Sequence, residues 1–218
     1  LWYVTPNGAG TQNGSSWANA RSLQNAVANL NSGQTELRLL QGNYLISSTL
    51  RIDWGRTVRL IGGYSGDGTT RDYTLYPTNL NGQNTTQIMY IEEDDCSIDG
   101  VNFINGFATG ADEGGAGLVL STNIAQIRNS TFRNNISEGG RGAGALFLMH
   151  GFNGAVLIDN CTFENNRSNH KVYPMGDNGG GAIHNWSDNV TIRNSVFRNN
   201  YAENEGGAIY SWGENFHL

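Results

Sequence analysis

An internal repeat constrains this chain more than any other feature of its sequence. Four segments share the pattern Ile-x-x-x-x-Phe, and their phenylalanines stand 29, 31 and 34 residues apart. The segments occupy residues 97–103, 126–132, 157–163 and 191–197. Repetition with a period near thirty residues is typical of a solenoid, in which each repeat forms one structural unit that stacks on the next.

A second short segment accompanies each of the four and consists of glycine, alanine and aliphatic residues. These segments occupy residues 116–119, 143–146, 180–183 and 206–209. The 218-residue chain contains 30 glycines and only 15% charged residues, a composition that suits many short strands joined by tight turns. We therefore predict an all-β protein folded as a right-handed parallel β-helix, with neighbouring coils one strand spacing, about 4.8 Å, apart.

Stacked coils place equivalent residues of the repeat in columns. We expect the isoleucine and phenylalanine columns to form the core: Ile98/Ile127/Ile158/Ile192 and Phe103/Phe132/Phe163/Phe197. Glycine and asparagine accept the left-handed conformation of tight turns, and asparagine amides hydrogen-bond along a stack. We assign this turn role to two columns: Gly100/Asn129/Asn160/Asn194 and Asn135/Asn166/Asn200.

Two further columns carry charges of alternating sign. They are Asp99/Arg128/Asp159/Arg193 and Ile104/Arg133/Glu164/Arg198, the second alternating after its first member. Opposite charges in adjacent coils attract, whereas a slip by one coil places like charges together. Since an exposed ion pair contributes only about 0–1 kcal/mol, we interpret these columns as a device that sets the register of the coils.

The first 35 residues are predicted to close the N-terminal end of the stack, and residues 36–218 to form its coils. A strand is expected at 2–5. Leu23, Ala26, Val27 and Leu30 follow helical spacing and predict one amphipathic helix, with Asn19 or Ser22 at its start and Gly33 at its end. Such a helix would shield strand edges and apolar core. The first coil strands are expected at 36–40, 49–52 and 58–61, and a loop at 66–82.

The Phe-x-x-Asn and Gly-Gly-Ala-Ile units together resemble the repeats of bacterial polymorphic outer membrane proteins, and more broadly those of secreted right-handed β-helix proteins. Segments 14–17, 62–64, 71–72 and 77–82 are similar to segments near the start of those domains. Gly106 departs from the pattern, because it stands where later repeats have asparagine. The resemblance implies export and display at the bacterial cell surface, and we expect the coils to continue in a longer parent protein.

Composition excludes several partners. The net charge is −6, and no basic patch is visible, so nucleic acid is not expected as a partner. No apolar run approaches the roughly 18 residues of a membrane span. Cys96 and Cys161 fall in different columns, and we expect buried thiols instead of a disulfide.

Catalytic candidates are few. The long segment 167–178 contains Lys171 and Tyr173, which with Arg141 are the types of base and cation that a β-helix polysaccharide lyase needs. Glycoside hydrolysis needs two carboxylates, and no pair stands out. Carboxylates suited to Ca²⁺ lie at Asp112, Glu113, Glu138, Asp177, Glu203 and Glu205. Their spacing matches no calcium loop, so we expect solvated surface and no cofactor.

Aromatic side chains give the more specific hypothesis. Phe147, His184 and Tyr210 occupy one column just after the glycine-alanine segments, and the next column contains Met149, Trp186 and Trp212. Alternation along a strand turns at least one column outward. Exposed rings would stack on sugars or be covered by another protein. We therefore favour a non-catalytic surface module, an adhesin or spacer, that binds a polysaccharide or another surface protein; the alternative is a polysaccharide lyase or hydrolase. The last coil, at 218, is expected to expose strand edges to a stacking partner.

Overall fold

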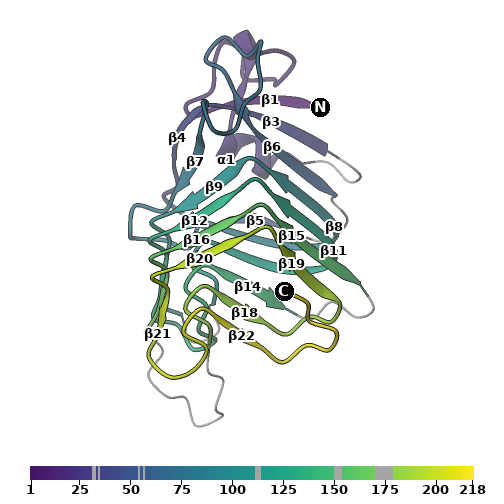
Figure 1. Ribbon diagram of the computed structural model, residues 1–218. Coiled ribbons are helices and arrows are strands. Elements are labelled where there is room, and N and C mark those ends of the chain that lie inside the picture. Colours follow the sequence, from purple (N-terminus) through teal and green to yellow (C-terminus); the bar gives the residue numbers. More distant parts are fainter. Residues whose placement is uncertain are drawn as a thin grey trace.

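A computed structural model describes residues 1–30, 33, 35–53, 55, 57–110, 114–149, 154–169 and 179–218. Within these residues the strands form three sheets, and every pairing between named strands is parallel. Successive coils stack on one another along the molecule, as Figure 1 shows. The prediction of an all-β parallel β-helix is confirmed.

The sheets differ in size. The twelve-stranded sheet contains β1 (Trp2–Thr5), β2 (Arg21–Ser22), β3 (Thr35–Leu40), β5 (Leu50–Ile52), β6 (Val58–Tyr64), β8 (Met89–Asp99), β11 (Leu118–Arg128), β14 (Leu146–Met149), β15 (Ala155–Asp159), β18 (Ile183–Asn185), β19 (Val190–Arg193) and β22 (Ile209–Ser211). The six-stranded sheet contains β4 (Gly42–Leu45), β7 (Thr78–Asn81), β9 (Val101–Ile104), β12 (Thr131–Arg133), β16 (Thr162–Glu164) and β20 (Val196–Arg198). The four-stranded sheet contains β10 (Phe107–Ala108), β13 (Ile136–Ser137), β17 (Arg167–Ser168) and β21 (Tyr201–Ala202).

Two long strands join two stacks of shorter strands into the largest sheet. The first part of β8 pairs with β5, and its second part pairs with β6. In the same way β11 pairs with β14 through its first part and with β15 through its second. The outer face of this sheet is therefore broad enough to hold a binding site.

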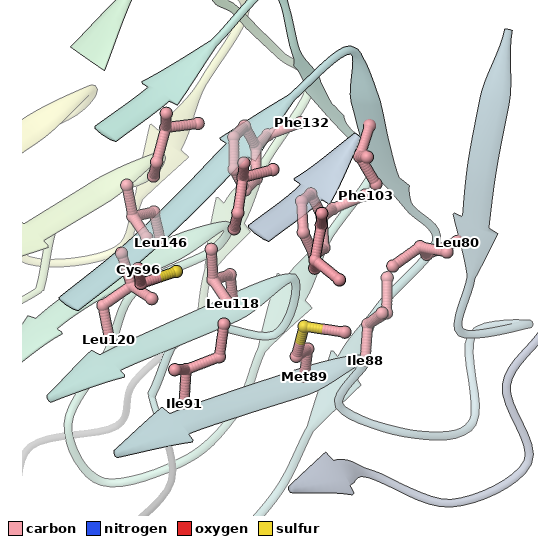
Figure 2. Close-up of a cluster of buried hydrophobic side chains, with 14 of the residues drawn as sticks. Leu80, Ile88, Met89, Ile91, Cys96, Phe103, Leu118, Leu120, Phe132 and Leu146 are labelled. Carbon is pink, nitrogen blue, oxygen red and sulfur yellow. The ribbon is translucent and has the colours of Figure 1, made fainter. Parts of the chain in front are cut away.

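The core contains the predicted columns. Phe103, Phe132, Phe163 and Phe197 stack with ring centroids 4.9, 4.8 and 4.8 Å apart and nearly parallel planes. The isoleucine column pairs in register from Ile98 through Ile192. Figure 2 shows Phe103 and Phe132 beside aliphatic side chains of β8, β11 and β14. Both core predictions are confirmed.

The turn before β9 follows the prediction. Gly100, Asn129, Asn160 and Asn194 have φ angles of 68°, 52°, 52° and 51°. Asn160 Nδ2 donates to Asn129 Oδ1 at 2.8 Å, so the amides bond along the stack. The column begins with glycine because a Cβ at position 100 would lie 2.9 Å from the Tyr73 Cβ.

The second asparagine column was assigned the wrong conformation. The left-handed residues of that turn are the preceding ones, Asn105, Asn134, Asn165 and Asn199, with φ between 54° and 57°. Asn135 and Asn166 are instead fully buried. Their side chains form a ladder: Asn135 Nδ2 donates to Asn166 Oδ1 at 2.9 Å, and Asn166 Nδ2 donates to Asn200 Oδ1 at 3.0 Å.

The buried ladder also bonds the backbone. Asn135 Nδ2 donates to the Phe103 carbonyl, and Asn166 Nδ2 donates to the Phe132 carbonyl. At the first coil the Gly106 N–H donates to Asn135 Oδ1 at 2.8 Å. A Cβ at Gly106 would lie 2.1 Å from the Ala116 carbonyl oxygen, so there is no room for asparagine in this coil.

The charge columns stack in register, but not every pair is the expected one. Asp159 pairs with Arg193 at 2.9 Å, and Glu164 pairs with Arg198 at 2.9 Å. Asp99 instead pairs at 2.9 Å with Arg71, which lies outside the repeat. The Nε atom of Arg128 is buried without a hydrogen-bond partner among the described residues.

The N-terminal helix closes one end of the core. A 3₁₀ turn at Trp17–Asn19 precedes α1, which spans Leu23–Ala28; the Asn25 N–H donates to the side chain of Ser22, the N-cap. The predicted apolar stripe of α1 joins the main core, and α1 contacts β1, β2 and β5. The helix ends at Ala28, before Gly33.

The predicted loop at 66–82 is wrong at its end. Residues 78–81 form β7, which pairs with β4 and β9, and Thr78 and Leu80 are buried. The segment therefore returns to the stack as a strand before the next coil begins.

Both cysteines are free and buried, as predicted. Burial raises the pKa of the Cys161 thiol to about 12. No helix in the described ranges is long and apolar enough to cross a membrane.

The asparagine ladder predicts the effect of one substitution. Asn166→Ala removes the Oδ1 that accepts from Asn135 and the Nδ2 that donates to the Phe132 carbonyl. Each buried polar group left unpaired costs about 1–3 kcal/mol, so we expect the free energy of unfolding to fall by at least about 2 kcal/mol in urea denaturation.

Asn165→Gly is the matched control. Asn165 is exposed with φ 54°, which glycine adopts without strain, and we expect a change below about 1 kcal/mol. Equal unfolding midpoints for the two variants would contradict the ladder.

Candidate binding groove

The aromatic column predicted from the sequence continues upstream along the outer face of the twelve-stranded sheet. In-register pairing aligns Arg51 with Tyr90, Tyr90 with Val119, Val119 with Phe147, Phe147 with His184, and His184 with Tyr210. These side chains point away from the core because their strand neighbours, such as Leu146 and Leu148, belong to the core. One column across six strands therefore contains a cation, four rings and a valine.

The second predicted column lies beside the first. The Trp186 N–H donates to the Leu148 carbonyl, and the Trp212 N–H donates to the Asn185 carbonyl. These bonds place Trp186 and Trp212 one coil apart, two residues beyond the members of the first column. Alternation along the strands places both columns on the outer face.

The rings are not uniformly exposed. Phe147 and His184 have relative exposures of 1% and 0%, whereas Trp212 is 65% exposed. Phe147 packs tilted on His184 with centroids 5.1 Å apart and edge-on to Trp186 at 5.0 Å. Tyr210 lies edge-on to His184 at 5.3 Å. A second small apolar cluster therefore lies outside the main core and contains Val119, Ala143, Phe147, Tyr90, Met149 and Trp186. In the last coil Tyr210 is half-buried and Trp212 is exposed.

Hydrogen bonds fix the tautomer of His184. The Trp186 indole N–H, which only donates, lies 2.6 Å from His184 Nε2. Nε2 is therefore unprotonated, and Nδ1 donates to the Arg141 carbonyl at 2.7 Å. The buried imidazole holds the Arg141 backbone in place, and the Arg141 guanidinium lies 5.5 Å from the Trp186 ring centroid.

A groove of about 570 Å³ lies along this outer face, and we call it the outer groove. Its lining residues are Thr49, Arg51, Gln87, Tyr90, Gly114, Val119, Arg141, Phe147 and Met149. Two arginines and no carboxylate belong to this described lining. The Gln87 amide donates to the Gly114 carbonyl at 2.8 Å, and this bond fixes two of the lining residues relative to each other.

Arg51 and Tyr90 form one wall of the groove. The Arg51 guanidinium lies 4.1 Å from the centroid of the Tyr90 ring, and it also lies 3.8 Å from the exposed Asp53 carboxylate. The Tyr90 hydroxyl donates to Met149 Sδ at 3.8 Å. Burial raises the pKa of Tyr90 above its usual value near 10, and the nearby Glu92 charge raises it further. The charges of Arg51 and Arg141 act in the opposite direction.

The groove brings together only part of the predicted site. Arg141, Phe147 and Met149 line it. His184 and Trp186 do not belong to the described lining, but they contact it: His184 donates to the Arg141 carbonyl, and Trp186 packs against Phe147. Thr49, Arg51, Gln87 and Tyr90 were missed, since they precede the recognisable repeats. The alternation of Arg51 with buried Leu50 and Ile52 was the one available signal.

The remaining candidates were catalytic or metal-binding. Lys171 and Tyr173 lie outside the described residues, as do Asp112, Glu113 and Asp177. Among the residues that the structure does describe, no three His, Cys, Asp or Glu side chains are grouped so that they could hold a metal ion.

Comparison with protein families finds the Chlamydia polymorphic membrane protein repeat at residues 160–185 and 194–211. The chain therefore contains this repeat, and the resemblance drawn from the sequence is confirmed. The repeat is typical of the β-helices of autotransporter passengers and adhesins, and it indicates an outer-membrane or surface-associated protein. No curated protein matches the chain. No solved structure matches it either.

The wall of the groove predicts a change in titration. Arg51→Gln removes a positive charge that lowers the pKa of Tyr90, so we expect this pKa to rise further above 10. Tyrosine labelled with ¹³C at Cζ reports the titration by NMR. Arg59→Gln, on β6, is the control and should leave the pKa of Tyr90 unchanged. An unchanged or lowered Tyr90 pKa in Arg51→Gln would show that the Arg51 and Tyr90 side chains are not in contact.

Proposed function

We propose that this chain is a non-catalytic, surface-displayed adhesin module that binds carboxylated glycans in the outer groove. One observation carries the proposal: the described lining combines two arginines with Tyr90, Phe147 and Met149 and contains no carboxylate. Guanidinium groups donate paired hydrogen bonds to carboxylates, and the half-buried Tyr90 ring can pack on the apolar face of a sugar, whereas the buried Phe147 supports the groove.

The dimensions of the groove support a ligand of this kind. Its volume of about 570 Å³ falls in the range of about 300–1,000 Å³ typical of small-molecule sites, which suits one or two sugar residues. The two cations come from different coils, Arg51 from β5 and Arg141 from the segment before β14. A ligand that bridges them would therefore contact several coils of a rigid scaffold.

Binding is favoured over hydrolysis by the same lining. Hydrolysis of a glycosidic bond needs an acid and a second carboxylate at a working distance, and the described residues of the groove provide neither. The surface association that the repeat indicates fits a binding role.

Calorimetric titration with galacturonic acid hexamer and with sialyllactose tests the proposal, and lactose serves as the neutral counterpart of sialyllactose. We expect at least one acidic probe to bind, and binding to weaken as NaCl rises, because salt screens exposed charges. Arg51→Gln and Arg141→Gln should each weaken binding about 10-fold or more, since a hydrogen bond to a charged group contributes about 1.5–3 kcal/mol.

Arg133→Gln is the matched control, because it removes the same charge from the exposed face of the six-stranded sheet. It should leave the affinity unchanged. Equal binding of lactose and sialyllactose, or equal losses in all three variants, would contradict the proposal. Release of unsaturated uronate or of new reducing ends during the titration would contradict its non-catalytic part.

A further inference from the structure

A second groove lies on the other side of the β-helix, outside the six-stranded sheet. The segment 65–77 leaves the stack after β6 and returns as β7, and its Tyr73 reaches over the turns of the following coils. A groove of about 440 Å³ lies between this segment and the sheet. We call it the amide groove, and its lining residues are Tyr73, Thr74, Pro77, Asn102, Asn129, Ser130, Thr131, Asn160 and Thr162.

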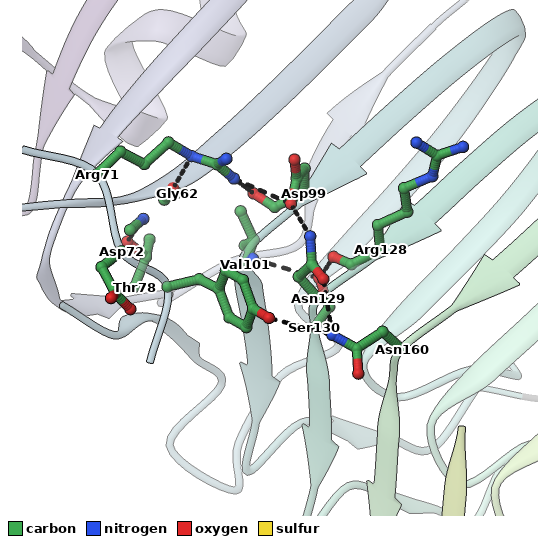
Figure 3. A network of polar contacts seen from close by, with 12 residues as sticks. Gly62, Arg71, Asp72, Thr78, Asp99, Val101, Arg128, Asn129, Ser130 and Asn160 are labelled. Atoms are coloured by element: carbon green, nitrogen blue, oxygen red, sulfur yellow. Dashed lines mark hydrogen bonds and ion pairs between the residues drawn. The ribbon is translucent and has the colours of Figure 1, made fainter. Parts of the chain in front are cut away.

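The segment that forms one wall is firmly attached. Arg71 donates from Nε to the Gly62 carbonyl at 2.9 Å and pairs through Nη2 with Asp99 at 2.9 Å. The Thr74 hydroxyl and the Thr74 and Leu75 N–H groups donate to Asp72 Oδ1, and these bonds lower the pKa of Asp72. Figure 3 shows Arg71 bridging Gly62 and Asp99 beside the asparagine turns. The wall is therefore preformed.

The floor is a regular polar surface. Asn129 donates to Asp99 Oδ1 at 2.7 Å, and Asn160 donates both to Asn129 Oδ1 at 2.8 Å and to the Tyr73 hydroxyl at 3.2 Å. This chain of bonds fixes both amides, as Figure 3 shows for Asn129 and Asn160. Beside them Thr131 and Thr162 are paired in register, one coil apart.

Several polar atoms on this surface have no partner within the described part of the chain. They are the hydroxyls of Thr131 and Thr162 and the hydroxyl hydrogen of Tyr73, which accepts from Asn160 but donates to no described group. All three groups line the groove, and none of its described lining residues is charged. The groove thus presents hydroxyls and fixed amides at a repeat of about 4.8 Å along the stack.

We infer that the amide groove is a second binding site, specific for an extended neutral oligosaccharide that lies along the stack of coils. The repeat of one coil is close to the length of one pyranose unit in an extended chain, so successive sugars would meet successive asparagine and threonine side chains. Sugar hydroxyls both donate and accept, and they match threonine hydroxyls and asparagine amides. The Tyr73 and Pro77 rings supply apolar surface at the wall.

The chemistry of the groove separates this ligand from other classes. An anionic glycan or acidic peptide would need a cation, and the part of the lining that the structure describes contains none. A hydrophobic peptide would need apolar pockets, whereas the floor contains only asparagine, serine and threonine side chains. The site is independent of the outer groove, which lies on a different sheet and contains two arginines.

The probes for a test are hexasaccharides of β-1,4-linked glucose, mannose and N-acetylglucosamine. We expect one of them to bind with an affinity that does not depend on NaCl, and to shift the side-chain amide resonances of Asn129 and Asn160 in NMR spectra. Tyr73→Phe and Thr131→Val each remove one hydroxyl, and each should weaken binding about 2- to 10-fold, the equivalent of one neutral hydrogen bond.

Two control variants locate the ligand. Thr191→Val makes the same change on β19 of the twelve-stranded sheet, and Arg51→Gln changes only the outer groove; both should bind the neutral probe as the parent does. Thermal unfolding of Tyr73→Phe and Thr131→Val shows whether the fold is retained, and the amide shifts report the site in either case. Failure of all three probes to bind overturns the inference. Loss of neutral binding in Arg51→Gln with none in Tyr73→Phe overturns it too, because the ligand then occupies the outer groove.

Discussion

Parallel stacking places every residue above its own counterpart, and the rest of the structure depends on this constraint. Apolar side chains satisfy this constraint by packing on their counterparts, as the phenylalanine rings do with centroids 4.8–4.9 Å apart. A buried polar side chain satisfies it only if it carries a donor and an acceptor. Asparagine carries both, so Asn135 bonds Asn166 and Asn166 bonds Asn200. A buried column of one charge would repel itself, and the charged columns accordingly alternate in sign and lie at the surface.

Because the interior columns maintain the register, the outer faces are free to vary. The outer groove uses the part of one in-register column that runs from Arg51 to Phe147. The amide groove uses the asparagine and threonine columns beside Tyr73. Hydrogen-bonded supports make both sites rigid: the buried His184 donates to the Arg141 carbonyl, and the half-buried Asp99 accepts from Asn129. A pre-organised polar surface loses little conformational entropy when it binds a ligand. Repetition thus creates the scaffold, and departures from it create the sites.

Sequence reasoning succeeded where the repeat is regular. It predicted the parallel β-helix, both core columns, the Asn129 turn and the outward aromatic column, because equal spacing implies equal positions in space. It failed where the chain departs from the repeat: β7, the Arg71–Asp99 pair and the Arg51 wall come from earlier, irregular coils. The Asn135 error has a local cause, since three of the four turns contain two successive asparagines. The first turn, Asn105-Gly106, distinguishes the two positions. The left-handed position is the one that is asparagine in all four turns.

The most direct test of like-on-like stacking is hydrogen exchange of asparagine side-chain amides, followed by NMR. The Asn135 and Asn166 amides are fully buried and bonded on both sides, so they should exchange only through global unfolding, at the rate of the slowest core backbone amides. The exposed amides of Asn134 and Asn165, one residue earlier in the same turns, should exchange at rates near those of an unfolded chain. Equally fast exchange of all four side chains would contradict the buried ladder and the coil register that depends on it.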